Sequence, residues 1–223
     1  MIISRQRGYI FVHIPKTGGT ALALALEAKA AKDDILIGDT PKARRRRGRL
    51  KDVEASGRLW KHARLRDIEG LVSVEEMEAM CVFTLVRNPW DRMVSYYHWL
   101  RAQHFDHPAV ARAQAMTFGA FVAHPGTAAE FRASPYPAYV TLPGGAERCD
   151  LFLRLERLAE DVATLEARLG FRIGPVPRAN ASARAVDYRA YYDADGAARV
   201  AEICAPDIAR FGYGFDDGPL PGA

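Results

Sequence analysis

Cysteine is scarce in this chain. Its 223 residues include only three cysteines, and Cys81, Cys149 and Cys204 lie far apart in the sequence. There is no CxxC pair and no cysteine–histidine cluster with the spacing of a zinc site. The sequence therefore indicates neither a disulfide framework nor a zinc centre, and it is typical of a protein that works in a reducing compartment.

Long hydrophobic runs are missing as well. No window approaches the roughly 20 apolar residues that a membrane-spanning helix needs. The opening residues, Met-Ile-Ile-Ser-Arg-Gln-Arg, lack the apolar core of a secretory signal peptide. From these two absences we expect a cytoplasmic protein without a membrane span.

The chain also lacks a large excess of charge of one sign. Its 31 basic and 27 acidic side chains give a net charge of +4, which suits an anionic ligand without requiring nucleic acid. With 49% hydrophobic and 26% charged residues the composition is that of a globular protein. We expect residues 1–223 to form a single domain, with a flexible C-terminal tail from about residue 214.

Three segments of the chain have a hydrophobic strand followed by a helix. Asn88 and Gly170 are suited to cap two of these helices, and a further helix is expected over 195–211. Strands that alternate with helices predict an α/β fold, here a P-loop-like domain whose central parallel sheet has helices on both faces. The expected strand and helix pairs are 8–14 with 18–32, 82–87 with 89–104, and 151–155 with 158–169.

The most informative segment is the loop Pro-Lys-Thr-Gly-Gly-Thr at 15–20, which follows the first expected strand. Small residues let backbone N–H groups surround an anion, the lysine adds a positive charge, and a helix N-terminus would face the same place. Lys16 precedes the glycines, whereas in a Walker A loop the lysine follows them. The loop predicts a phosphate or sulfate site, and a tight structural turn with a solvent-exposed lysine is the alternative.

A second motif, LVRNPWDRMVSYY at 85–97, follows the second expected strand. Arg87 at the strand end and Ser95 on the following helix could bind one phosphate from two sides. The alternative is a structural Arg87 paired with Asp91 and a Ser95 that faces solvent. Ligands of such sheets bind outside the carboxyl ends of the strands, so one site could hold both motifs.

Two other functions are compatible with these motifs. A P-loop kinase or NTPase would place an acidic residue where Arg87 ends its strand, so this function is disfavoured. The basic run at 43–49 could instead belong to a nucleotide- or nucleic-acid-binding module without catalysis. The run could also be a solvated loop, or a clamp for a negatively charged acceptor or for the anionic donor nucleotide itself.

Together, HIPKTGGT and RNPWDRMVSYYHW resemble the two signature motifs of sulfotransferases that use 3′-phosphoadenosine 5′-phosphosulfate (PAPS). The resemblance is to the family-2 branch, which includes Golgi carbohydrate sulfotransferases and bacterial relatives. Further similar segments lie at 153–156, 178–182 and 207–213. The resemblance implies sulfuryl transfer from PAPS to a hydroxyl or amine, with adenosine 3′,5′-bisphosphate as product and no metal or nucleic acid involved. The acceptor would be a small molecule or a glycan, as in carbohydrate sulfation.

The resemblance also implies roles for individual residues. Arg87 and Ser95 would bind the 3′-phosphate, and Lys16 would stabilise the charge that develops on the leaving oxygen. The 5′-phosphosulfate would be held by Lys16, Thr17, Gly18, Gly19 and Thr20.

A transfer to a hydroxyl needs a general base, and histidine is the usual one. His62 in LWKHAR at 59–64 is the first candidate, because this segment resembles the family segment that carries the base. His13 lies beside the loop but could be a packed core residue. The remaining histidines are His98, His104, His107 and His124.

Two further features remain open in the sequence. Asn180 and Ser182 lie in a segment that either closes over the nucleotide or forms a turn. Glu156 follows the third strand and is interpreted as an anchor for the helix start rather than as the base.

Overall fold

The computed structural model describes residues 1–177 and 184–218. Packing divides the chain into two compact units, each built from two segments. The first unit comprises Met1–Val86 and Tyr136–Asn180, and the second comprises Arg87–Pro135 and Ala181–Ala223. The expectation of a single domain over 1–223 stays a prediction. The segment at 178–182 and the end of the expected flexible tail lie outside the described residues.

The first unit contains a five-stranded sheet in the order β3-β1-β2-β4-β5. β2, β4 and β5 are parallel to one another, which confirms the expected α/β fold and its parallel centre. β1 runs antiparallel to both β2 and β3, so the complete sheet is mixed. The turn between β1 and β2 explains this difference, because a link of four residues can only join antiparallel neighbours. The strands are β1 (Ile2–Ser4), β2 (Tyr9–Val12), β3 (Ile35–Leu36), β4 (Cys81–Val86) and β5 (Leu151–Arg154).

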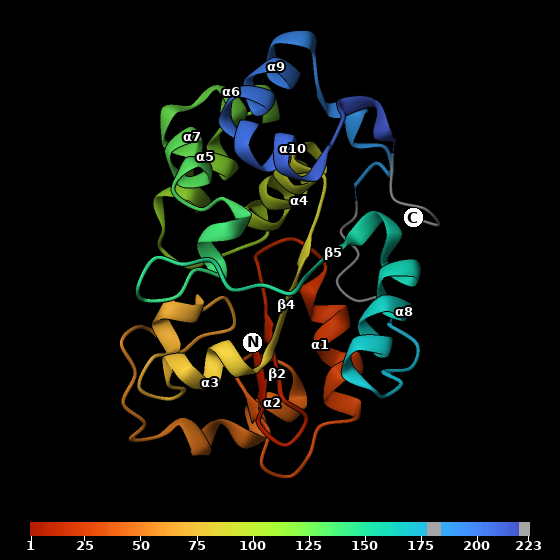
Figure 1. Ribbon diagram of the computed structural model, residues 1–223. Coiled ribbons are helices and arrows are strands. Elements are labelled where there is room, and N and C mark those ends of the chain that lie inside the picture. The colour runs from red at the N-terminus through yellow and green to blue at the C-terminus, as the bar shows by residue number, and fades with distance from the viewer. Residues whose placement is uncertain (178–183, 219–223) are drawn as a thin grey trace. The chain divides into compact units, whose positions relative to one another are not determined.

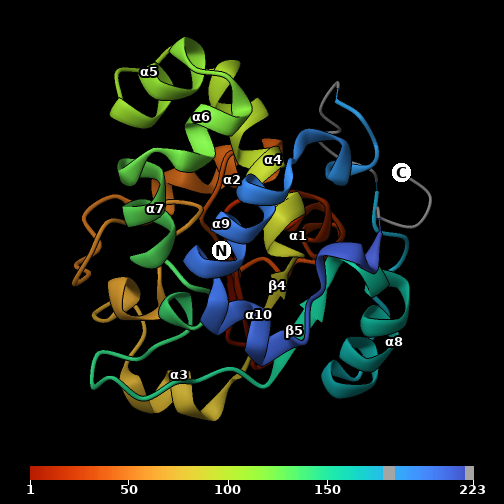
Figure 2. The same ribbon diagram turned by 90° about the horizontal axis from the view of Figure 1, so that it is seen from above.

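Helices of the first unit lie on both sides of these strands. In Figures 1 and 2, α1 (Gly19–Ala28) and α8 (Leu158–Leu169) lie on one side, and α3 (Val74–Ala79) lies on the other. The short helix α2 (Pro41–Arg46) follows β3. α8 has its expected bounds, and Gly170 ends it with a left-handed φ of 73° as predicted. α1 ends four residues before the expected Lys32.

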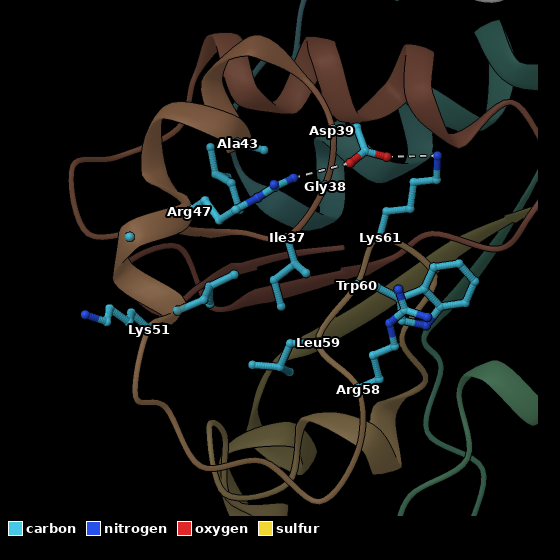
Figure 3. Close-up of a pocket in the computed structure, with 13 residues that line it drawn as sticks. Ile37, Gly38, Asp39, Ala43, Arg47, Lys51, Arg58, Leu59, Trp60 and Lys61 are labelled. Carbon is cyan, nitrogen blue, oxygen red and sulfur yellow. Dashed lines mark ion pairs between the residues drawn. The ribbon is translucent and has the colours of Figure 1, made fainter. Parts of the chain in front are cut away.

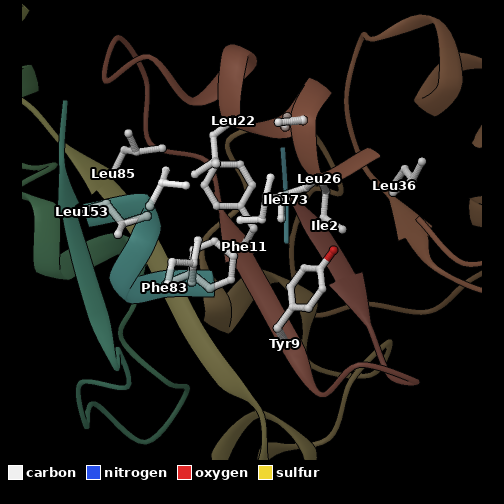
Figure 4. Close-up of a cluster of buried hydrophobic side chains, with 14 of the residues drawn as sticks. Ile2, Tyr9, Phe11, Leu22, Leu26, Leu36, Phe83, Leu85, Leu153 and Ile173 are labelled. Carbon is white, nitrogen blue, oxygen red and sulfur yellow. The ribbon is translucent and has the colours of Figure 1, made fainter. Parts of the chain in front are cut away.

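One hydrophobic cluster joins α1 and α8 to the sheet (Figure 4). Alternate residues of a strand point to the same face, and this places Phe11 of β2 beside Phe83 of β4, with ring centroids 5.5 Å apart. Leu22 and Leu26 of α1 and Leu165 of α8 pack onto this face and are fully buried. The core therefore fixes α1 on the sheet, and with it the loop that precedes the helix.

The second unit is built around α4 (Pro89–Arg101), which contacts α5, α6 and α9. Asn88 caps α4 as predicted, because its side chain accepts a hydrogen bond from the Trp90 N–H at 3.0 Å. The expected apolar stripe of this helix is buried as well, at Trp90, Met93, Val94, Tyr97 and Leu100. The other helices are α5 (Pro108–Ala115), α6 (Phe118–Ala123), α7 (Pro125–Arg132), α9 (Ala194–Ile203) and α10 (Ala205–Phe211).

The single helix expected over 195–211 is wrong, because two helices, α9 and α10, occupy this segment. Pro206 lies at the start of α10. Proline has no N–H to donate, and its ring would collide with the carbonyl four residues earlier in a continuous helix. The break therefore falls at Cys204, whose φ of −107° is outside the helical range.

None of the helices in the described ranges is both long enough and apolar enough to cross a lipid bilayer.

Candidate functional site

The loop between β2 and α1 has a tight and partly strained backbone. Lys16 has a φ of 66° and Gly18 a φ of 85°, both in the left-handed region. Thr17 is completely buried, and its hydroxyl donates a hydrogen bond to the Ile14 carbonyl at 3.0 Å. The Thr17 side chain thus holds the turn together. Lys16 and Thr20 are half-buried.

Both glycines of the loop are required by close packing. A Cβ atom on Gly18 would lie 2.6 Å from Leu155 Cδ1, and one on Gly19 would lie 2.2 Å from His13 Cδ2. α1 begins at Gly19 with no side-chain cap and no acidic residue in its first turn. The first N–H groups of a helix have no partner within the helix, and the helix dipole adds positive potential there. The loop therefore forms a compact site suited to an anion.

Two histidines lie against this loop within the first unit. The buried His13 ring stacks on Phe11 at 6.0 Å and meets the His62 ring edge-on at 4.7 Å. His62 Nδ1 lies 2.8 Å from the His13 carbonyl oxygen. Because a carbonyl oxygen only accepts, Nδ1 of a neutral His62 carries the hydrogen and Nε2 keeps the lone pair.

Both rings are held in the neutral form. Burial lowers the pKa of His62 to about 3; the bond to the His13 carbonyl opposes this shift, and the nearby Lys61 and Lys16 charges add to it. Burial also holds the pKa of His13 well below its usual value, with further lowering by His62. His62 Nε2 thus keeps its lone pair at neutral pH, and the low pKa makes the ring a weak base. The structure brings His62, His13 and the loop together, and the role of His62 as base stays a prediction.

Two of the remaining histidines are helix caps. Nδ1 of His107 accepts a hydrogen bond from the Ala109 N–H at 3.1 Å at the start of α5. Nδ1 of His124 accepts one from the Gly126 N–H at 3.0 Å at the start of α7. These contacts give both residues a structural role. His104 is exposed beyond the end of α4.

Arg87 is the residue directly after β4, and it belongs to the second unit. Its Nε and Nη2 donate to Asp91 Oδ2 at 2.8 and 2.6 Å, and both side chains are almost fully buried. The pairing with Asp91 that the sequence left open is therefore present. Ser95 on α4 is 7% exposed, so it does not face solvent freely. The phosphate-binding roles of Arg87 and Ser95 stay predictions.

A second arginine, which the sequence did not single out, joins this pair. Arg184 Nη2 donates to the other Asp91 oxygen, Oδ1, at 2.6 Å. Its Nη1 is buried, and so is Nε2 of His98 on α4; neither has a hydrogen-bond partner among the described residues. Burial lowers the pKa of His98, with the Arg184 charge contributing. Two guanidinium groups on one carboxylate leave a positive excess, and a buried donor without a partner is costly.

These features make the cluster of Arg87, Asp91, Ser95, His98 and Arg184 a candidate anion site of the second unit. An oxyanion would satisfy the Arg184 donor, which has no partner within 1–177 and 184–218, and would offset the excess charge. The signal for Arg184 was its place two residues after the 178–182 segment, which the family resemblance marks. Asn180 and Ser182 themselves lie outside the described residues.

The basic run at 43–49 is divided between different roles. Arg46 donates to the Ala31 and Asp34 carbonyls at 2.7 and 3.1 Å, and Arg49 donates to the Lys32 carbonyl. These two arginines hold the chain segment after α1. Arg47 is different, because it lies 3.6 Å from Asp39 and lines a pocket. The run is therefore not one uniform solvated loop.

Glu156 lies in a short 3-10 turn, Leu155–Arg157, between β5 and α8. Its role as an anchor for the helix start stays a prediction.

Comparison with known proteins gives one structural likeness. No protein-family model matches the chain, and no curated protein matches it. The fold is similar to the crystal structure of mouse sulfotransferase SULT7A1 complexed with PAP, with a TM-score of 0.48 and 15% sequence identity. The match covers 91% of this chain and 84% of that chain. Because the TM-score is below 0.5, this likeness carries no weight for the function.

Proposed function

We propose that the chain is a PAPS-dependent sulfotransferase that transfers a sulfuryl group to a hydroxyl or amine of an acceptor. The observation that carries this proposal is the loop before α1. It combines a lysine, two glycines that packing requires, an uncapped helix start and a histidine pair with one available nitrogen. The motif resemblance also favours the family-2 branch, a carbohydrate or small-molecule acceptor and a cytoplasmic setting.

Two groups of residues fit such a donor: the loop before α1 and the arginine cluster of the second unit. The loop fits the 5′-phosphosulfate, since α1 offers N–H groups and Lys16 a positive charge. The cluster of the second unit fits a phosphate, since the Arg184 donor is buried without a partner among the described residues. In this proposal Arg87, Ser95 and Arg184 bind the 3′-phosphate. Thr17, Gly18, Gly19 and Thr20 bind the other end with Lys16, and Thr17 does so through the turn that its hydroxyl stabilises.

When bound, PAPS supplies the sulfuryl group for an in-line displacement by the acceptor. Lys16 stabilises negative charge that develops at the loop, an effect that is strong because its position is preorganised. Nε2 of His62 takes the proton of the acceptor hydroxyl. Asp91 orients the two arginines, because each of its oxygens is bonded to a different guanidinium.

Ligand-induced thermal stabilisation tests the donor. We expect adenosine 3′,5′-bisphosphate to raise the melting temperature of the protein at concentrations where ATP and AMP do not, because a ligand that binds only the folded state stabilises it by mass action. A screen with labelled PAPS and candidate acceptors would then detect transfer. An equal, Mg²⁺-dependent response to ATP would contradict the proposal and favour a kinase or NTPase. Salt-dependent binding of DNA or RNA without a response to the bisphosphate would favour a binding module.

A further inference from the structure

A pocket of about 770 Å³ lies in the first unit, between the end of β3 and the segment 58–61 (Figure 3). Its walls combine apolar and basic side chains. The half-buried Leu50 and Leu59 provide apolar surface, and Trp60 is 41% exposed. A pocket of this size and mixed lining suits an organic molecule rather than a single ion.

The charged groups of the pocket are mostly positive. Arg47, Lys51, Arg58 and Lys61 line it, and Asp39 is the one acidic residue among its lining residues. Asp39 Oδ2 lies 3.0 Å from Lys61 Nζ, and its Oδ1 lies 3.6 Å from Arg47 Nη2 (Figure 3). The hydrogen bond from Lys61 is the main reason why the pKa of Asp39 is lowered. The lining thus carries four cations and one carboxylate, which pairs with two of them, and the remaining positive charge favours an anionic ligand.

Contacts within the first unit connect this pocket to the histidine pair. The Trp60 ring, in the wall of the pocket, meets the His62 ring edge-on at 5.0 Å. His62 contacts His13 at 4.7 Å, and a Cβ on Gly19 would touch the His13 ring. The pocket is therefore two side chains away from the loop at the start of α1. Trp60 therefore separates the pocket from His62, the proposed base.

We propose that this pocket binds the acceptor, and that the acceptor is a hydroxyl-bearing ring compound with a negative charge. The cations supply the attraction for a carboxylate, sulfate or phosphate, and Trp60 with the leucines supplies contact for the ring. This inference rests on the proposed sulfotransferase function and assigns the acceptor class to it. Two sources share this chemistry, an acidic saccharide and an acidic phenol.

Matched ligand pairs test the pocket without any need for catalysis. The probes are a glucuronate-containing disaccharide with its carboxyl-reduced counterpart, and 4-hydroxybenzoate with phenol. Binding to the wild-type protein is measured by calorimetry in the absence of PAPS, and intrinsic fluorescence, to which Trp60, Trp90 and Trp99 all contribute, gives a second readout. We expect the charged member of at least one pair to bind at least roughly tenfold more tightly than its neutral partner, and the pair that binds identifies the source. Added salt should weaken this binding.

Single substitutions connect the binding to the pocket. Arg47→Gln should weaken binding of the charged probe roughly threefold to tenfold, whereas Arg45→Gln, an exposed residue of the same run outside the pocket lining, should leave it unchanged. Asp39→Asn should strengthen binding, because it removes the carboxylate that competes for Arg47 and Lys61. Circular dichroism and melting temperature of each variant show that it is folded.

The outcomes separate the acceptor assignment from the sulfotransferase assignment. Equal binding of charged and neutral probes, or equal effects of Arg47→Gln and Arg45→Gln, would overturn the acceptor proposal even if adenosine 3′,5′-bisphosphate binds. Competition between that bisphosphate and the charged probe would also overturn it, because the pocket would then belong to the nucleotide site. If the protein binds the charged probe selectively but does not bind the bisphosphate, the anion pocket is supported and the sulfotransferase function is contradicted.

Discussion

Lys16 combines a functional charge with an unfavourable backbone conformation. Its φ of 66° lies where a residue with a Cβ is disfavoured by about 1–2 kcal/mol. Glycine would relieve this strain, yet the sequence has lysine at this position. Backbone strain at a single residue is typical of functional sites, where the role of the side chain outweighs the backbone energy.

We expect Lys16→Ala to lower the transfer rate roughly 10²–10³-fold while adenosine 3′,5′-bisphosphate still binds, because the lost charge acts on the transition state. Lys16→Gly should lose as much activity but be at least as stable as the alanine variant, since glycine accepts the positive φ. Initial rates, bisphosphate titrations and thermal melts of both variants check this. Unchanged turnover in either variant would show that Lys16 does not take part in the transfer step.

His62 offers a test by pH. Burial lowers its pKa to about 3, so the ring stays neutral and Nε2 stays available between pH 5 and pH 8. A histidine base with an ordinary pKa would make the rate fall on acidification with a midpoint near pH 6.5. We expect no such fall in the rate at saturating acceptor. His62→Ala should lower this rate roughly 10²–10⁴-fold across the whole range. An unaffected His62→Ala rate would exclude His62 as the base, whereas a wild-type midpoint near pH 6.5 would show that the pKa of the base is not lowered when the acceptor is bound.

At the scale of elements, Asn88 has more contacts than a helix cap needs. Its Oδ1 caps α4, and its Nδ2 donates to the Gly214 carbonyl at 2.9 Å and to the Tyr188 hydroxyl at 3.2 Å. The residue therefore connects the start of α4 to two later segments of the second unit. It also directly follows Arg87, whose position depends on where α4 begins.

We expect Asn88→Ala to destabilise the protein by about 2 kcal/mol or more, because it removes the cap and leaves the partly buried Gly214 carbonyl without this donor. Asn88→Ser keeps a capping oxygen and loses only the amide contacts, so it should recover about 1 kcal/mol relative to alanine. Urea unfolding of the three proteins measures the difference. Equal stability of Ala and Ser variants would show that capping by Asn88 contributes little.

Elements with a local signal could be predicted from the sequence, and those without one could not. β2, the glycine loop, the Asn88 cap and the end of α8 at Gly170 each depend on neighbouring residues, and all were anticipated. β1 and β3 have three and two residues, too few to show a period. Arg184 binds Asp91 across 93 residues of sequence, and no local pattern encodes such a contact. The pocket has the same origin, because residues between 36 and 61 that are irregular in sequence combine to form it.

At the scale of the whole molecule, stability depends on keeping His13 and His62 neutral. An unfolded histidine has a pKa near 6.5, whereas burial holds both folded values lower, at about 3 for His62. Below pH 6.5 the unfolded chain therefore binds protons that the folded chain does not bind. The contribution of the two histidines to the free energy of unfolding is therefore fully present above pH 6.5. It decreases as the pH falls from 6.5 towards 3.

Urea unfolding at pH 7.5, 6.5 and 5.5 tests this dependence, and the range above pH 5 limits the contribution of carboxylates with lowered pKa values, such as Asp39 and Glu76. We expect wild-type stability to fall between pH 6.5 and 5.5. The fall should be smaller in His62→Gln, because one of the two histidines that resist protonation is gone. His104→Gln, at an exposed histidine, should follow the wild type. A His62→Gln protein with the wild-type pH dependence would mean that His62 is protonated as easily in the folded chain as in the unfolded one, and that the neutral ring proposed as the base is wrong.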